Sequence, residues 1–164
     1  MMKISAFGDE IAVDFEEQLQ VLKKLNIRSI DVRQAWGVTC SDLTDEQVQS
    51  IKDLCEKYDI SVACMGSPIG KSPIGDPLDA ELNRLKRLAE VAKALGTNKI
   101  RLFSFYPAGE VTQDDINNSI DRLKQLAELA ESLGLQLWLE NEKGLVGDTP
   151  ERNYALLHAI DSPT

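Results

Sequence analysis

Short apolar runs alternate with amphipathic stretches along the chain. Five runs rich in β-branched and aromatic residues predict strands at 3–7, 28–33, 60–65, 99–105 and 135–140. Apolar residues that recur every three or four positions predict helices at about 14–25, 45–58, 79–95, 113–133 and 150–160. Two helices end in related segments, "RLAEVAKALG" and "QLAELAESLG", and a strand follows each of them. The pattern therefore predicts a series of βα units.

Residues with capping chemistry support three of the helix starts. Thr44 and Gln47 have the spacing of a capping box, and Asp14 with Glu17 follows the same pattern. The run 149–151 places a threonine N-cap before a proline and an acidic residue, which is a typical first turn.

Strict alternation of strands and helices predicts an α/β fold with a parallel sheet. Two architectures compete, an open doubly wound sheet and a (β/α)8 barrel of the TIM type. One set of alternate strand positions is apolar, whereas the other includes Asp31, Arg33 and Arg101. A doubly wound sheet is covered by helices on both faces and should be apolar on both. Polar residues on one face therefore favour the barrel, with these residues in its interior or in a site above it.

The length sets a limit on this barrel. A complete one takes about 250 residues, whereas the sequence has 164 and stops where a sixth strand would begin. We therefore expect a single domain over residues 1–164, incomplete at its C-terminus and truncated to about five βα units. Such a piece leaves both sheet edges open, with an inner face that carries Phe7, Phe103 and Trp138. Open edges predict a homo-oligomer.

Composition narrows the class of partner. The net charge is −9, which disfavours nucleic acid because phosphate binding depends on a field of lysine and arginine. No stretch approaches the ~20 apolar residues of a membrane helix, and the first residues lack the apolar core of a signal peptide. We expect a cytoplasmic protein with no membrane contact. Cys40, Cys55 and Cys64 have no metal-knuckle spacing and are expected to be reduced, small buried hydrophobic residues.

Two features look like familiar sites but are better explained otherwise. The segment "GSPIGKSPIG" at 66–75 has too few residues between its glycines for a phosphate loop, and Pro73 interrupts the helix that such a loop needs. Because it follows a strand, it is either a lid or substrate-contacting loop or a plain connector. His158 is the only histidine and falls within a predicted helix, so a solvated helix face is expected and no histidine-based triad or metal cluster can be assembled.

Candidate chemistry lies at the ends of strands. In "LWLENEKG", at 137–144, Glu140 ends the fifth strand with interior parity. A buried carboxylate without a partner is costly, so either a metal or substrate contact or a salt bridge to Arg101 must compensate for its burial. Glu142 lies beyond the strand and is either a loop contact or solvated. Trp36 follows the second strand, where an indole either stacks on a sugar or packs on the core.

Several segments, in order and spacing, resemble the xylose isomerase-like TIM-barrel family of sugar (phosphate) isomerases and epimerases, which includes an AP endonuclease branch. They are "MKISAFGDEI", "SIDVRQAWG", "GSPIGKSPIGD", "KIRLFSFY" and "LENEKGLVGDTPER". The resemblance covers the whole chain but only about the first five eighths of the family fold. "LENE-KG…GDT" is its most specific part.

The resemblance implies a metal-dependent sugar or sugar-phosphate isomerase or epimerase of carbohydrate metabolism, which transfers a proton next to a carbonyl. It assigns Glu140 as both catalytic group and ligand of a divalent cation (Mn, Mg, Co or Zn) in the complete protein. The other metal ligands and the second carboxylate have no counterpart in this sequence, so the chain itself is expected to bind no metal or to bind it incompletely. Many relatives carry a histidine where Glu142 stands, which leaves the substrate open. The substrate-contacting residues expected are Glu10, Arg33, Trp36, Arg101 and Glu142.

Two other hypotheses remain. The chain is a catalytically inactive or self-associating piece of such a barrel, or it follows the AP endonuclease branch. The negative charge and the single histidine weigh against the second.

Overall fold

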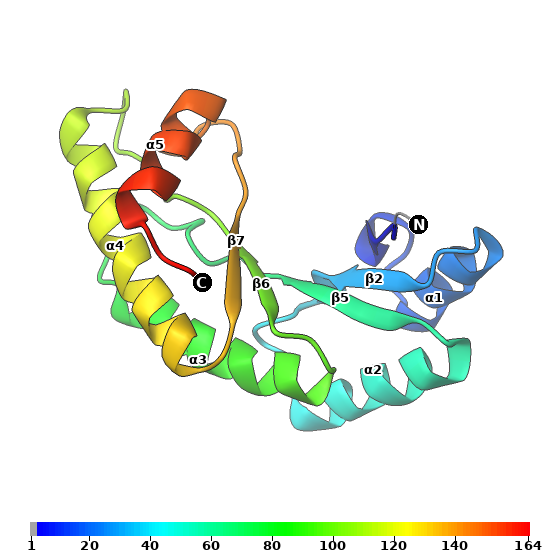
Figure 1. Ribbon diagram of the computed structural model, residues 1–164. Helices are drawn as coiled ribbons and strands as arrows, with labels where there is room; N and C mark the ends of the chain where they lie inside the picture. Colours follow the sequence, from blue (N-terminus) through cyan, green and yellow to red (C-terminus); the bar gives the residue numbers. More distant parts are fainter. Residues whose placement is uncertain (1–2) are drawn as a thin grey trace. The chain divides into compact units, whose positions relative to one another are not determined.

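The computed structural model describes residues 3–164 (Figure 1). All five predicted strands and all five predicted helices form, although strand β1 is shorter than expected. The strands are β1 (Ala6–Phe7), β2 (Ser29–Val32), β5 (Ser61–Gly66), β6 (Lys99–Leu102) and β7 (Gln136–Leu139), with a hairpin of β3 (Gln34–Ala35) and β4 (Val38–Thr39). The helices are α1 (Phe15–Lys24), α2 (Asp45–Tyr58), α3 (Asp79–Ala94), α4 (Gln113–Ser132) and α5 (Pro150–Ile160), with a short 3₁₀ helix η1 (Gly8–Glu10).

The main sheet is parallel, as the alternation predicted. Ala6 lies opposite Ile30, and Ile30 lies opposite Val62. The strands succeed one another in the order β1-β2-β5-β6-β7, which is chain order. The α/β class with helices packed on a parallel sheet is thereby confirmed. The chain divides into two compact units, Met1–Ser67 with Arg87–Ile100 and Pro68–Lys86 with Arg101–Thr164. The single domain over residues 1–164 stays a prediction.

The first unit has its core between β2, β5 and the helices α1 and α2. Helix α1 contacts α2, and its apolar stripe is buried, as are the apolar side chains of β2. The caps form as predicted: Asp14 accepts a hydrogen bond from the Glu17 backbone N–H, and Thr44 and Gln47 complete a capping box. The buried core residues include Phe15, Leu19, Leu22, Ile30, Val32 and Ile51.

The hairpin after β2 is an element that the sequence did not predict. Its two central residues, Trp36 and Gly37, have φ angles of 54° and 75°. Positive φ at both central residues is the geometry of a type I′ turn, which suits tight hairpins. The Trp36 backbone N–H donates to the Val13 carbonyl at 2.8 Å and ties the turn to the segment before α1.

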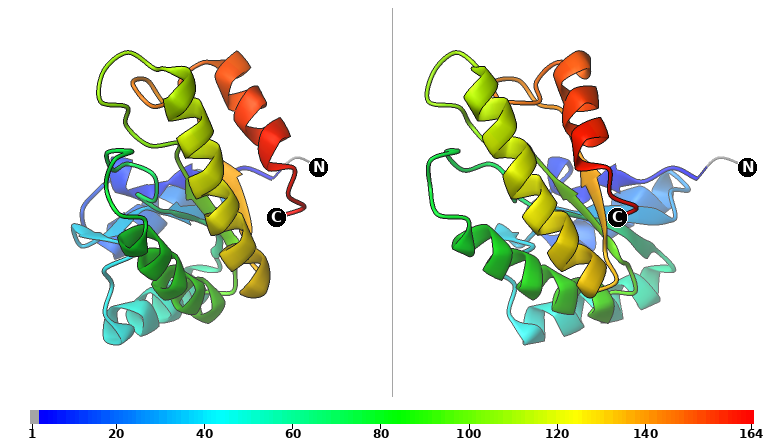
Figure 2. Two further views of the ribbon diagram at one scale, coloured as in Figure 1. Left: turned by 90° about the vertical axis from the view of Figure 1, so that its left-hand side faces the viewer. Right: turned by 60° about the vertical axis from the view of Figure 1, so that its left-hand side comes forward.

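The second unit packs α4 and α5 side by side, as both views of Figure 2 show. Thr112 caps α4 and Thr149 caps α5, which begins with Pro150 as predicted. After α5 the chain returns to β7, where the Leu137 backbone N–H donates to the Thr164 carbonyl at 2.9 Å. Trp138 is 49% exposed, in line with an open inner face. Phe103, expected on the same face, is fully buried, because Lys71 and Arg101 lie over its ring.

Two further expectations concern membranes and thiols. Within residues 3–164, every helix is too short or too polar to span a bilayer. Cys40, Cys55 and Cys64 are buried thiols, which confirms that they act as small core residues.

Burial makes a testable difference to Cys55. Desolvation, helped by the charge of Glu56, raises the pKa of this thiol to about 11. At pH 8 about one molecule in a thousand carries the reactive thiolate. We expect iodoacetamide to label Cys55 very slowly in the native protein and readily in urea, as followed by mass spectrometry. Because the folded state holds this proton more tightly than the unfolded state, the stability it contributes is lost as the pH rises from about 9 to 11. Fast native labelling at pH 8 would contradict the assignment.

Candidate functional site

The segment after β5 is a strap, residues 68–75, that lies along the end of β6. Four backbone hydrogen bonds fix it to residues 103–106. Ile69, Gly70 and Ser72 accept from the N–H groups of Phe103, Phe105 and Tyr106, and the Ile74 N–H donates to the Tyr106 carbonyl, at 2.8–3.0 Å. Ile69 and Ile74 are buried. The strap is therefore part of the packed unit, which argues against a mobile lid and leaves a substrate-contacting loop and a plain connector as the interpretations of this segment.

Two interactions set the position of the strap. Gly70 has a φ of +80°, and a Cβ on it would lie 2.1 Å from the Phe103 carbonyl oxygen, so only glycine fits. Further along, the Ser72 hydroxyl donates to Glu81 at 2.8 Å, and Arg84 donates to the same carboxylate at 2.7 Å. Glu81 is 3% exposed, and both bonds offset the cost of burying its charge.

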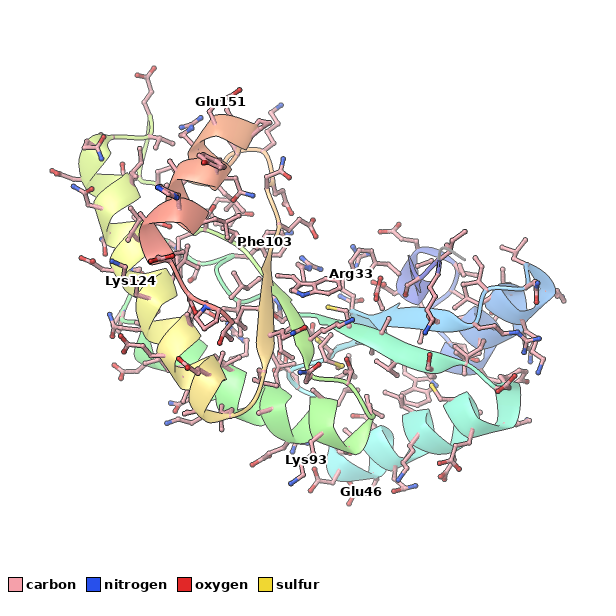
Figure 3. The ribbon with its side chains drawn as sticks, in the orientation of Figure 1. Arg33, Glu46, Lys93, Phe103, Lys124 and Glu151 are labelled. Carbon is pink, nitrogen blue, oxygen red and sulfur yellow. The ribbon has the colours of Figure 1, made fainter. Side chains whose placement is uncertain are left out.

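The fixed strap brings Lys71 to a cluster around Phe103, which Figure 3 labels. The Lys71 Nζ lies 4.3 Å from the centroid of the Phe103 ring, and the Arg101 Cζ lies 4.3 Å from the same centroid. Lys71 pairs with Glu142 at 2.8 Å, and Arg101 pairs with Glu140 at 3.5 Å. We call these five residues the Phe103 cluster. The cations are held by the ring and by the carboxylates together.

Glu140 follows the last residue of β7, and its backbone N–H donates to the Leu102 carbonyl at 2.9 Å. Its side chain is 42% exposed, while that of Arg101 is 10% exposed. The salt bridge considered as the alternative partner of Glu140 is thus present. At 3.5 Å it is longer than a charge-assisted hydrogen bond, and it leaves much of the carboxylate open to solvent. Glu140 can therefore reach a ligand without being extracted from the core.

A second cluster lies in the first unit, where Arg33 follows β2. Its guanidinium donates to Asp9 at 2.6 Å and to Glu10, and lies 5.2 Å from the Phe7 centroid. Partial burial acts to lower the pKa of Arg33, but the hydrogen bonds to Asp9 and Glu10 outweigh it and raise the pKa above its ordinary value. The Asp9 side chain is 8% exposed, whereas that of Glu10 is largely exposed. Glu10 and Arg33 thus lie together, and their contact with a substrate stays a prediction.

Trp36 occupies the hairpin turn, and its ring lies 5.7 Å from the ring of buried Phe15. Trp36 therefore packs on the core through this contact, which was one of the two roles expected of it. Stacking of its indole on a sugar stays a prediction.

His158 is exposed on α5 and stacks on Tyr154 at 5.9 Å, as expected of a helix-face histidine. Sequence reasoning gave Asp9 and Lys71 no role, and it placed Phe7 and Phe103 on the inner face without assigning them to a site. Asp9 precedes Glu10 at the end of a strand, and Lys71 lies in a strand-end loop, so position alone offered a weak signal for both.

A divalent cation needs several ligand side chains gathered around one point. Within residues 3–164, no group of three or more histidine, cysteine, aspartate or glutamate side chains is arranged to hold a metal ion. In the Phe103 cluster, Glu140 faces Arg101 and Glu142 faces Lys71. The described residues therefore do not form a metal centre by themselves, and Glu140 offers at most one ligand.

Several solved structures share the fold of this chain. A xylose isomerase-like TIM barrel protein from Mycobacterium smegmatis, in complex with magnesium, matches with a TM-score of 0.76 at 17% identity. The probable 3-DHS dehydratase from Bacillus anthracis matches at 0.79 and 18%, and D-allulose 3-epimerase from Methylomonas sp. at 0.72 and 19%. The matches cover 98%, 99% and 98% of this chain but 61%, 60% and 60% of those chains. The chain thus spans about 60% of the length of these structures.

No curated protein matches the chain. A family model described as xylose isomerase-like TIM barrel matches residues 19–164, which is most of the sequence. Together with the parallel sheet in chain order, this match confirms the barrel type expected from the strand parity. The chain belongs to the xylose isomerase-like TIM barrel family.

Proposed function

We propose that the chain is part of a metal-dependent sugar or sugar-phosphate isomerase or epimerase that moves a proton at the carbon next to a carbonyl. One observation carries the proposal: Glu140 is a half-open carboxylate at the end of β7, oriented by Arg101. Barrel enzymes place their chemistry at this end of the strands. D-allulose 3-epimerase, one of the structural neighbours, gives the reaction class by its name.

In the proposed mechanism Glu140 is the base. Its exposed oxygen takes the proton from the substrate carbon, while Arg101 holds the carboxylate in place and donates to a substrate oxygen. General base catalysis of this kind contributes about 10²–10⁴-fold in rate. Inversion at the carbon needs a second group on the opposite face, so Glu140 alone performs proton removal and return on one face.

We further propose the substrate contacts and the cofactor. The residues that contact the sugar are Glu10, Arg33, Trp36, Arg101 and Glu142. Glu140 would give one ligand to a divalent cation (Mn, Mg, Co or Zn) that polarises the carbonyl, the other ligands coming from the part of the relatives' length that this chain does not span. A second copy at the open sheet edges is the partner proposed for assembly, and no nucleic acid is expected.

The test separates proton removal from inversion. The protein is incubated with D-allulose in D₂O, with Mn²⁺ or Mg²⁺ and with EDTA, and proton NMR follows loss of the signal next to the carbonyl. We expect that proton to exchange for deuterium with EDTA present, because Glu140 is the proposed base. Exchange should be faster with metal where the remaining metal ligands are supplied, and an epimer should form where a second base is supplied. Absence of exchange under every condition would refute the proposal.

A further inference from the structure

We propose that Lys71 is a substrate-binding residue, whose ammonium donates to an uncharged hydroxyl or carbonyl oxygen of the sugar beside Glu142. This inference rests on the proposed function and deepens it, because it assigns a new residue and a substrate class to the same site.

Contacts of the neighbouring residues fix the backbone position of Lys71. The strap that carries it has backbone hydrogen bonds on both sides of the residue, through Gly70 and Ser72. Gly70 brings the strap against the Phe103 carbonyl, where a Cβ has no room. The Ser72–Glu81 bond fixes the next residue to a buried carboxylate. A surface lysine without a role would not need such support, because its long side chain normally samples many rotamers.

The surroundings of the ammonium suit a hydroxyl group. A lysine ammonium has three N–H donors, and the bond to Glu142 uses one of them. The Phe103 ring packs on the same group, and one third of the side chain stays exposed. Lys71 and Glu142 therefore present a donor and an acceptor side by side. A hydroxyl group, which both donates and accepts, is the natural complement of that pair.

The charges favour an uncharged oxygen over a phosphate. Both cations of the Phe103 cluster, Lys71 and Arg101, already lie beside carboxylates. A phosphate group, with a charge of about −1.5 to −2, would have to displace Glu142 from Lys71 and approach Glu140 as well. A neutral sugar binds without breaking either ion pair.

The first experiment is a lysine footprint. Lysines are reductively methylated with formaldehyde and dimethylamine–borane, and the rate at each is read by mass spectrometry, with D-allulose or inorganic phosphate as the probe. At a concentration of D-allulose about four times its Kd, Lys71 should react about fivefold more slowly. Lys124 on α4 (Figure 3), which is exposed in the same unit, should not change. Inorganic phosphate should leave Lys71 unchanged.

The second experiment uses variants and ligand-observed NMR titration of D-allulose. Lys71→Met should weaken binding about tenfold, since a charge-assisted hydrogen bond is lost. Lys71→Arg should retain part of the affinity, and Lys124→Met all of it. Circular dichroism checks that each variant is folded.

The outcomes distinguish the two claims. If D-allulose binds but neither protects Lys71 nor loses affinity in Lys71→Met, the assignment of Lys71 is overturned while the proposed function stands. Protection by phosphate would overturn the uncharged substrate class. If the wild-type protein binds no D-allulose at all, the proposed function fails and the assignment fails with it.

Discussion

Gly70→Ala is expected to lower the free energy of unfolding by about 3 kcal/mol and the melting temperature by roughly 6–12 °C. Two costs add. A non-glycine residue in the left-handed region costs roughly 1–2 kcal/mol, and Gly70 has a φ of +80°. The new methyl would also lie 2.1 Å from the Phe103 carbonyl oxygen, and overpacking of this kind costs about 1–3 kcal/mol. The contact is with backbone, so a side-chain rotation cannot relieve it.

Two other glycines of the same unit separate these costs. Gly134 has a φ of +69° and no atom within 4 Å of its built Cβ, so Gly134→Ala should show only the backbone cost, about 1–2 kcal/mol. Gly75 lies at the end of the strap. A Cβ added to it would have no atom within 4 Å, and its φ is not positive. Gly75→Ala should therefore be neutral or stabilising by up to about 1 kcal/mol. Urea unfolding of the three variants should rank them in this order, and equal effects at Gly70 and Gly134 would contradict the steric argument.

The elements were predictable because their signals are local. Helix α2 has its cap and its apolar stripe within its own residues, and α5 has a threonine N-cap followed by proline, so their predicted ranges agree with the observed ones. The position of the strap could not be predicted from local signals, for a physical reason. The need for glycine at position 70 comes from the Phe103 carbonyl, a contact between segments far apart in sequence. From sequence alone, "GSPIGKSPIG" could be rejected as a phosphate loop, but it stayed open between a lid or substrate-contacting loop and a plain connector.

For the same reason, the sequence indicated only some contacts of the candidate site. Glu140 and Arg101 lie on neighbouring strands with the same parity, and parallel strands place such residues side by side. The sequence therefore offered their salt bridge as one of two alternatives, and the structure contains it. The Lys71–Glu142 pair joins two loops, and no periodic rule aligns loops. The hairpin was missed because Trp36 adopts a positive φ, which is uncommon for a bulky residue. Sequence patterns thus located the strand ends but not the long side chains that meet beyond them.

Glu140→Gln is expected to slow proton exchange next to the carbonyl of D-allulose by about 10²–10⁴-fold, because an amide cannot act as the base. The fold should tolerate the change. The amide oxygen of the substituted side chain can still accept from Arg101, and a pair whose carboxylate is 42% exposed contributes about 0–1 kcal/mol. A large loss of exchange with an unchanged melting temperature would therefore report chemistry rather than unfolding. The measurement is the same NMR assay in D₂O that tests the proposed function.

The matched control is Glu142→Gln, in the same cluster and with the same change of charge. Glu142 pairs with Lys71 and lies in the loop beyond β7. The role proposed for it is substrate binding, and on that proposal the proton step does not depend on it. We expect Glu142→Gln to raise the KM for D-allulose while the rate at saturation changes little, whereas Glu140→Gln lowers the rate at saturation. Since both variants remove one negative charge near Phe103, a general electrostatic effect would affect them alike. Equal loss of the saturated rate in both, or an unchanged rate in Glu140→Gln, would remove Glu140 from the role of base.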